Sequence, residues 1–518
     1  MNATSETNEF SLLGHKPALF VLFFTEMWER FSYYGMRAIF VLFLVKNWEW
    51  SNERAVGLLM IYTSTVYLTP FIGGIIADKF LGYQKAVAFG ALAMTLGHAA
   101  LAFETEMTLY IGIGLLIIGN GLFKPNVTSI VSGLYDKYPD RKDGAFTIFY
   151  MGVNAGGFLG VLLCGFLASN LSYAWGFGLA GIFMFLGTMQ FWFGRSIFGN
   201  VGISPSVKLD LSDAFAGEGS TNKGEEINNI EKVPVNVQRD RYIVVGLLAF
   251  FTVFFWTAFE QASGSMTIFA SDYTQRTLEG NAALIFKIVD TLITIVPLGI
   301  ISWVLFKLFR QTFQKISRSN IILGISFLGI WFIAIWKLTI ILPKENAEIE
   351  ASWFLILNSL FIIGLAPLFS KWWESKYNPS AAVKFGIGML LLGIGFGALA
   401  YGASGIPQGA KTASVSIIWL VIAYFLHTMG ELCVSPVGLS YVSKLVPPKK
   451  IGMMFGIWYL VNFIGNFLAG YIGKSIDSIV EQHSMSFFFL IFTIIPVVVG
   501  LIFLVLNPLM KKLMHGIR

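Results

Sequence analysis

The feature that most constrains this chain is a series of long apolar segments that recurs from one end to the other. Each segment is about 20 residues or longer, enough for a helix to cross the roughly 30 Å of hydrocarbon in a bilayer. Only 13% of the 518 residues are charged, whereas a soluble domain carries about 25%. The sequence therefore predicts an all-α, polytopic membrane protein.

The apolar segments fall into two groups separated by a polar stretch. The first group is predicted at about 17–46, 53–77, 82–104, 107–135, 143–169 and 174–196. The second group is predicted at about 241–271, 283–310, 319–342, 351–375, 380–403, 414–445, 451–473 and 484–510. The stretch between them has the composition of a linker and reads GEGSTNK at Gly217–Lys223. We therefore predict fourteen spans: an N-terminal six-helix bundle (1–196), a cytoplasmic linker (197–240) and a C-terminal six-helix bundle (241–518) with an extra helix pair at about 283–342.

The distribution of basic residues predicts which side of the membrane each loop occupies. With both termini inside, roughly 25 Lys and Arg fall on the inner side and about 8 on the outer side. This bias explains the net charge of +6 without a nucleic-acid partner. The polar segment 1–16 lacks the basic-then-apolar order of a cleaved signal peptide, so the first helix is expected to be retained. The two cysteines, Cys164 and Cys433, lie in separate apolar segments and predict no disulfide framework or metal site.

The first span carries charges that lipid disfavours. Its middle reads TEMWERFSYYGMR from Thr25 to Arg37 and includes Glu26, Glu29 and Arg30. Each charge costs about 2.5–3.5 kcal/mol at a helix centre. At 100° per residue, the four charged residues and Tyr33 fall within about 100° of one another, so one face of the helix must contact partners or water. An ion-pair network that only holds helices together is the alternative, but a cluster this dense favours a substrate or proton path.

Three further charges stand alone in apolar segments. Lys124 lies in GNGLFKPNVTS, Glu260 in FFWTAFEQASGS and Glu431 in HTMGELCVSPVG. With Arg37, they give two cations from the first half and two anions from the second. Such a bipolar site suits a zwitterion whose charges are several ångströms apart. Ser435, one turn after Glu431, is added to the predicted site.

The embedded carboxylates also suit proton coupling. A buried carboxyl group next to a cation can bind or lose a proton and so break or make an ion pair. None of the five histidines lies in the first two spans. His427, one turn before Glu431, is either a modulator of that carboxylate or a packed core histidine.

Several motifs follow one another along the chain. The pattern ExxERFxYYG stands at Glu26–Gly35, the loop GGIIADKFLGYQK at Gly73–Lys85 and FYMGVNAG at Phe149–Gly156. In this order the motifs resemble those of the proton-coupled oligopeptide transporters of the major facilitator superfamily. The match extends through Phe255–Gln261, Asn358–Pro367 and Gly430–Gly438, and so covers most of the chain. The resemblance implies two six-helix bundles that carry di- and tripeptides with protons by alternating access.

The resemblance also implies roles for individual residues. The residues implied in proton coupling are Glu26, Glu29, Arg30 and Glu260. Those implied in holding the peptide carboxylate are Arg37 and Lys124, and those receiving its N-terminus are Glu431, Asn154 and Asn358. Those implied in lining the pocket are Tyr33, Tyr34, Tyr67, Trp256 and Trp458. For Tyr67, Trp256 and Trp458, ordinary helix packing is the alternative.

From the same resemblance we expect a bacterial inner-membrane protein with both termini in the cytoplasm, working as a monomer. Its implied partners are peptides, protons and the lipid bilayer. No cofactor, metal or nucleic acid is implied. One departure from the family pattern is visible. Many bacterial members place an extra helix pair between the sixth and seventh core helices, where this chain has the polar stretch 197–240; its two extra segments, about 283–310 and 319–342, follow the seventh span. We expect this pair to pack at the periphery.

Other functions stay open at this point, because a fold does not fix a substrate. One alternative is transport of another small solute, such as nitrate or an amino-acid derivative, which a lack of competition by dipeptides would favour. A membrane-embedded enzyme is a second alternative, but the sequence shows no metal-ligand cluster, nucleophile arrangement or phosphate loop. The glycine doublets Gly73-Gly74 and Gly156-Gly157 are better interpreted as helix-packing sites. A receptor or channel is the third alternative.

Overall fold

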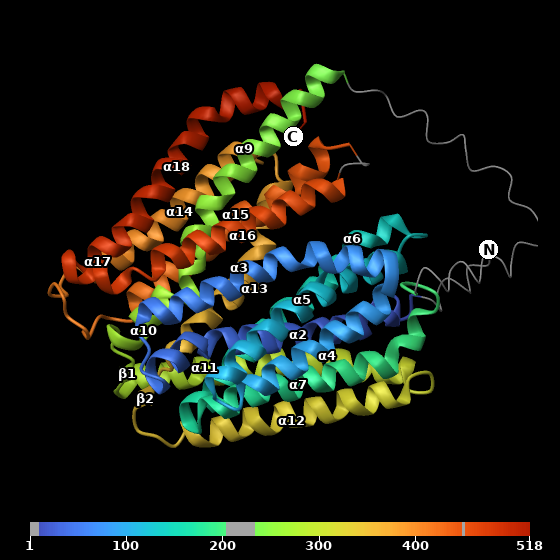
Figure 1. Cartoon of the computed structure of the whole chain (residues 1–518), viewed down its shortest axis with the longest axis horizontal. Coiled ribbons are helices and arrows are strands. Elements are labelled where there is room, and N and C mark those ends of the chain that lie inside the picture. The colour runs from blue at the N-terminus through green and yellow to red at the C-terminus, as the bar shows by residue number, and fades with distance from the viewer. Residues whose placement is uncertain (1–9, 204–233, 448–450, 518) are drawn as a thin grey trace, which may run out of the picture. The chain divides into compact units, whose positions relative to one another are not determined.

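The computed structural model describes residues 10–203, 234–447 and 451–517. The part of the predicted linker from 204 to 233 lies outside the described residues. The described chain is almost wholly helical (Figure 1). A two-residue ladder joins β1 (Thr277–Leu278) to β2 (Ala347–Glu348) in antiparallel register. The predicted all-α class is confirmed.

Each of the fourteen predicted spans coincides with one long helix among the described residues. The first six are α2 (Pro17–Leu42), α3 (Asn52–Ile76), α4 (Tyr83–Leu101), α5 (Glu106–Leu134), α6 (Pro139–Asn170) and α7 (Tyr173–Gly194). The other eight are α9 (Val235–Phe259), α11 (Gly280–Thr312), α12 (Ser317–Ile341), α13 (Ile356–Glu374), α14 (Ala381–Gly402), α15 (Ile418–Leu445), α16 (Ile451–Gly473) and α18 (Met485–Leu513). The shorter helices are η1 (Phe43–Asn47), η2 (Ala77–Leu81), η3 (Arg195–Phe198), η4 (Glu260–Ser263), α10 (Ser265–Asp272), η5 (Ala351–Leu355) and α17 (Ile476–Gln482). Within the described ranges, eleven helical segments are long and apolar enough to cross a membrane. The first helix, with its four charged residues, is not among them.

The described chain divides into two compact units. The first contains residues 10–51, 68–203 and 267–359, and the second contains 52–67, 234–266 and 360–517. Three helices, α3, α10 and α13, therefore contribute to both units. The sequence-based division at 196 and 240 stays a prediction about functional halves.

Helix α2 lies at the centre of the first unit and is buried at 23 of its 26 positions. Glycines one turn apart on α6 bring the two backbones into contact. A Cβ atom at Gly156 would lie 2.1 Å from the Met27 carbonyl oxygen, and one at Gly160 would lie 2.1 Å from that of Phe31. No side chain larger than hydrogen fits at either position without moving the α2 backbone. At Gly73 of α3, a Cβ would lie 1.9 Å from the Gly121 carbonyl oxygen, so a side chain there would have to move the α5 backbone. The glycine motifs are therefore packing sites, as the sequence predicts.

The inserted pair α11–α12 belongs to the first unit, although it follows the seventh predicted span. Helix α12 packs along α7 (Figure 1). Its Phe327 ring lies 5.6 Å, centroid to centroid, from both Phe24 and Trp28 of α2. Ser319 donates a hydrogen bond of 2.8 Å to the Gln190 carbonyl of α7. The pair thus covers one side of the charged helix.

In the second unit, α14 packs against α15 and α18, and α9 packs against α16. Helix α9 ends at Phe259, and the chain continues in the tighter η4, so Glu260 stands at a break between two helical forms. His427 is 2% exposed and its ring lies 4.4 Å from that of Phe396. A Cβ at Gly395 would lie 2.5 Å from the His427 ring, so this histidine is packed in the core.

Candidate functional site

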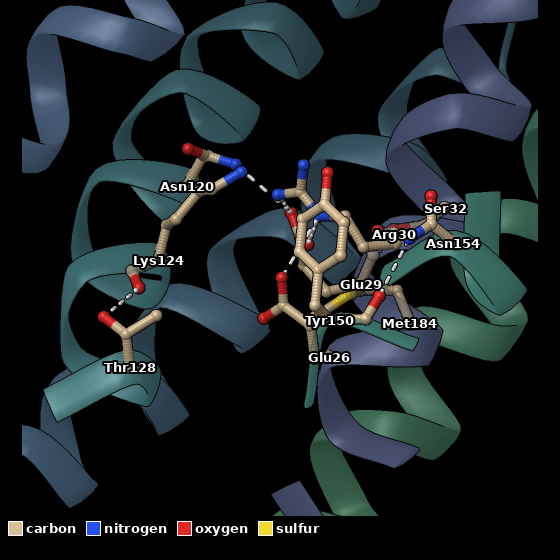
Figure 2. Close-up of polar contacts among 10 residues, drawn as sticks. All are labelled: Glu26, Glu29, Arg30, Ser32, Asn120, Lys124, Thr128, Tyr150, Asn154 and Met184. Atoms are coloured by element: carbon tan, nitrogen blue, oxygen red, sulfur yellow. Dashed lines mark hydrogen bonds and ion pairs between the residues drawn. The ribbon is translucent and has the colours of Figure 1, made fainter. Parts of the chain in front are cut away.

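The charged residues of α2 form one buried network in the first unit. Glu26, Glu29 and Arg30 are 2%, 0% and 3% exposed. The Arg30 guanidinium binds Glu29 through two nitrogens: Nε contacts Oε2, and Nη2 donates to Oε1 at 2.6 Å. The same Nε lies 3.4 Å from Glu26 Oε1, one turn back along the helix. Figure 2 shows these three side chains turned toward one another. One guanidinium therefore serves two carboxylates, as the periodicity of the motif predicts.

Helix α5 brings two polar residues to this network. Asn120 Nδ2 donates to Glu29 Oε1 at 3.2 Å (Figure 2). Lys124, one turn further along α5, interacts electrostatically with Arg30 and with both carboxylates. Two carboxylates, one guanidinium and one ammonium make the group electrically neutral when all four are ionised. Adding or removing a single proton therefore leaves a net charge inside the unit, which must be compensated.

The sequence predicted Lys124 but missed Asn120. Both lie in the segment GNGLFK, and a spacing of four residues places them on one face of a helix. An amide in an apolar span is a weaker signal than a charge, so the sequence alone does not single out Asn120. Asn120 holds the carboxylate of Glu29 in place from a second helix.

Aromatic rings cover the guanidinium. The Arg30 Cζ lies 4.9 Å from the ring centre of Tyr33 and 5.8 Å from that of Tyr34. The two tyrosine rings meet edge to face at 5.0 Å. A cation over an aromatic face is stabilised further when water is excluded. Arg37 is also buried in this unit, at 8% exposure.

Two predicted polar residues of the first unit lie on other helices. The Asn154 side chain of α6 is half-buried and donates to the Tyr150 carbonyl one turn earlier, at 3.0 Å (Figure 2). Asn358 stands in the first turn of α13 and is also half-buried. Their predicted roles at a peptide N-terminus stay predictions.

The remaining predicted residues lie in the second unit. These are Tyr67, Trp256, Glu260, Glu431, Ser435 and Trp458. Glu260, Glu431 and Ser435 are all half-buried, and the last two share one face of α15. A Cβ at Gly438 would lie 2.3 Å from the Trp458 ring, and one at Gly465 would lie 2.6 Å from the Trp256 Cβ. Both tryptophans thus pack on glycines of neighbouring helices, and their place in a pocket stays a prediction.

The described residues hold no group of three or more His, Cys, Asp or Glu side chains that could bind a metal ion. What the α2 network offers instead is acid–base chemistry. A proton on either carboxylate weakens its ion pair with Arg30 and frees part of the guanidinium for another anion.

Comparison with known proteins places the chain among transporters. The model of the POT family matches residues 84–217 and 336–488. The di-/tripeptide transporter of Lactococcus lactis subsp. cremoris is 31% identical over 100% of this chain and 99% of its own length. The uncharacterized transporter YclF of Bacillus subtilis is 33% identical over 97% of this chain and 96% of its own.

Solved structures agree. The crystal structure of peptide transporter POT in complex with sulfate has a TM-score of 0.72 and 28% identity, with 100% of both chains covered. A mutant form of a peptide transporter POT in complex with alafosfalin gives the same TM-score and identity and covers 97% of each chain. Family model, full-length relatives and fold converge: the protein is a multi-pass membrane transporter rather than an enzyme, and the chain belongs to the POT family.

Proposed function

We propose that the protein imports di- and tripeptides together with protons across a bacterial inner membrane by alternating access. The observation that carries this proposal is the neutral, buried network of Glu26, Glu29 and Arg30 with Asn120 and Lys124 beside it. With the Lys124 ammonium counted, the two carboxylates and the guanidinium make a group of zero net charge, so one added proton or one added anion changes its charge.

Two further observations support the peptide as substrate. Several relatives that match over nearly their full length are named di-/tripeptide transporters. The second unit carries the carboxylates Glu260 and Glu431, whereas the first carries the cations Arg37 and Lys124. Peptides have a cationic and an anionic end, and this division of charge suits them. In the proposal, Arg37 and Lys124 bind the carboxylate, Glu431, Asn154 and Asn358 the amine, and Glu260 takes part in proton binding.

We also propose which residues line the pocket, which side of the membrane the termini face, and the oligomeric state. Proposed walls are Tyr33, Tyr34, Tyr67, Trp256, Ser435 and Trp458. We further propose that both termini face the cytoplasm, because roughly 25 basic residues against about 8 then lie inside. The working unit is a monomer.

The experiment is uptake of a labelled dipeptide into proteoliposomes, with and without an inward proton gradient. Wild type is compared with Glu431→Ala, and with Glu348→Gln as a control whose side chain is 70% exposed. We expect accumulation that depends on the gradient, is competed by unlabelled di- and tripeptides, and is lost in Glu431→Ala only. Folded wild-type protein that takes up no peptide would overturn the substrate assignment and direct the search to other small solutes. Uptake that ignores the gradient would overturn proton coupling.

A further inference from the structure

The inserted helix pair contains a second cluster of buried charges, distinct from that of α2. Asp290 of α11 is 1% exposed and Lys337 of α12 is 2% exposed, and they form an ion pair. The Trp353 indole Nε1 donates to the other Asp290 oxygen, Oδ1, at 3.0 Å. Lys337 Nζ also lies 3.5 Å from Thr294 Oγ1. Both carboxylate oxygens of Asp290 thus have a partner. The Lys337 ammonium, the one buried cation of this cluster, is already paired with Asp290.

A second carboxylate lies against the same cluster. Glu350 stands between β2 and η5, and its side chain is turned onto α6. Its Oε1 accepts a hydrogen bond of 3.4 Å from Asn170 Nδ2. Its Oε2 would lie 3.3 Å from a Cβ at Gly165, and Ser352 Oγ would lie 2.5 Å from it. The glycine is what allows the segment 350–352 to lie directly on α6.

The charged groups around Glu350 do not offset its charge. Four charged groups act on it electrostatically. They are Lys337 of α12, Asp290 of α11, Glu348 of β2 and Arg276, which directly precedes β1. Arg276 Nη1 donates to the Ile349 carbonyl at 2.8 Å and lies 3.8 Å from Glu348 Oε1. Helix α6 offers the Asn170 amide and the bare backbone at Gly165. Two carboxylates therefore share a lysine that Asp290 already holds.

We propose that Glu350 is a proton-binding site, and that the bound proton keeps the segment 348–353, which runs from the end of β2 into η5, packed against α6. A neutral carboxyl group can lie on an apolar helix surface beside Asp290 at little cost, whereas a carboxylate there is repelled and lacks a full set of donors. Losing the proton favours release of the segment 348–353 from α6 and leaves the Asp290–Lys337 pair intact.

Titration of Glu350 falls in the neutral range. Burial raises the pKa of its carboxyl group to about 7; Lys337 opposes this shift, Asp290 adds to it, Arg276 opposes it and Glu348 adds to it. The folded-state pKa thus lies above its ordinary value of 4.5. The contribution of the bound proton to stability is complete below pH 4.5 and disappears as the pH rises to about 7. This inference does not depend on which solute the protein carries.

The test is hydrogen–deuterium exchange of the detergent-purified protein between pH 5 and 8.5, expressed as protection factors so that the intrinsic pH dependence cancels. In wild type we expect amide protection over 348–353 to fall at least tenfold between pH 5 and 7 and to level off above pH 7. In Glu350→Gln, which keeps a neutral side chain of the same shape, protection stays constant. Glu348→Gln, a neighbour on the exposed side of the strand, keeps a transition, moved to lower pH because its carboxylate no longer adds to the shift at Glu350.

Wild type alone decides the question if Glu350→Gln folds poorly. Constant protection over 348–353 from pH 5 to 8.5 in wild type overturns the proposal, and so does an unchanged transition in Glu350→Gln. Because neither measurement involves transport, failure here leaves the proposed peptide symport untouched, and a failed uptake experiment leaves this site untouched.

Discussion

Two buried charge clusters in the first unit differ in how their groups are held. Glu26, Glu29 and Arg30 all belong to one helix, so no movement between helices can separate them. Asp290 belongs to α11, Lys337 to α12 and Glu350 to the segment between β2 and η5, and the three stay together only while these parts are packed. A cluster on one helix can exchange partners without unfolding anything and suits coupling. A cluster whose members lie on separate segments stabilises the packing of those segments against one another.

Removing one charge from the α2 network is the strongest test of this difference between the clusters. Glu29→Gln leaves Arg30 with only the more distant Glu26. Losing one partner of a buried pair costs about 3–5 kcal/mol, and about 1.4 kcal/mol corresponds to a tenfold change. We therefore expect proton-driven dipeptide uptake to fall about 100-fold or more in proteoliposomes. Uptake at the wild-type rate would show that the network is only a helix-packing device.

The matching change in the inserted pair is Lys337→Met, which leaves Asp290 buried without its cation. We expect a loss of about 3–5 kcal/mol in stability, seen as a lower thermal unfolding temperature in detergent. Uptake per folded molecule should change little. The double variant Asp290→Leu with Lys337→Met should recover most of the stability, since apolar replacement of a whole buried pair is often neutral. If the double variant is no more stable than the single one, stabilising this packing is not the role of the pair.

Helix α6 contacts both clusters, and its glycines allow a graded test. Gly156→Ala places a Cβ against a backbone carbonyl, which cannot rotate away, and should cost about 3 kcal/mol. Gly165→Ala meets the Ser352 hydroxyl, which can turn, and should cost about 1 kcal/mol. The control is Gly364→Ala on another helix, α13, where a Cβ would meet nothing within 4 Å. Thermal unfolding of the three variants checks this order, and equal losses at Gly156 and Gly165 would contradict it.

The smallest expected effect is that of Asn120→Ala. Hydrogen bonds to charged groups contribute about 1.5–3 kcal/mol, but Glu29 keeps its two contacts with Arg30. We expect about a tenfold fall in proton-driven uptake with little change in thermal stability, both measured on the same preparation. Asn126→Ala, on the same helix with its amide bonded to backbone carbonyls, should leave coupling intact. A loss of stability without a loss of coupling would make Asn120 a packing residue.

The long helices and the α2 network could be predicted from sequence because both arise from local periodicity. An apolar run of span length fixes a helix, and charges three and four residues apart share one face. Glu26, Glu29 and Arg30 therefore appear in the structure as their spacing implies.

Contacts between distant segments could not be predicted. That α11–α12 lies on α7 and α2 depends on Phe327, Ser319 and Gly194, whose types are common in any apolar helix. Glu350 belongs to the polar stretch ENAEIE, where nothing in the sequence separates the half-buried carboxylate from its exposed neighbours. Asn120 does not stand out in the sequence because an amide in a membrane helix carries no net charge.

The short ladder between Thr277–Leu278 and Ala347–Glu348 has a consequence for the history of the chain. By pairing these strands in register, the fold brings together the two points at which residues 279–346 leave and rejoin the main chain. A segment whose ends meet can be gained, lost or exchanged at a single joint without stretching what lies on either side. The α11–α12 pair is thus a module, one that evolution could graft into a helical scaffold and that an engineer could replace with a tight turn.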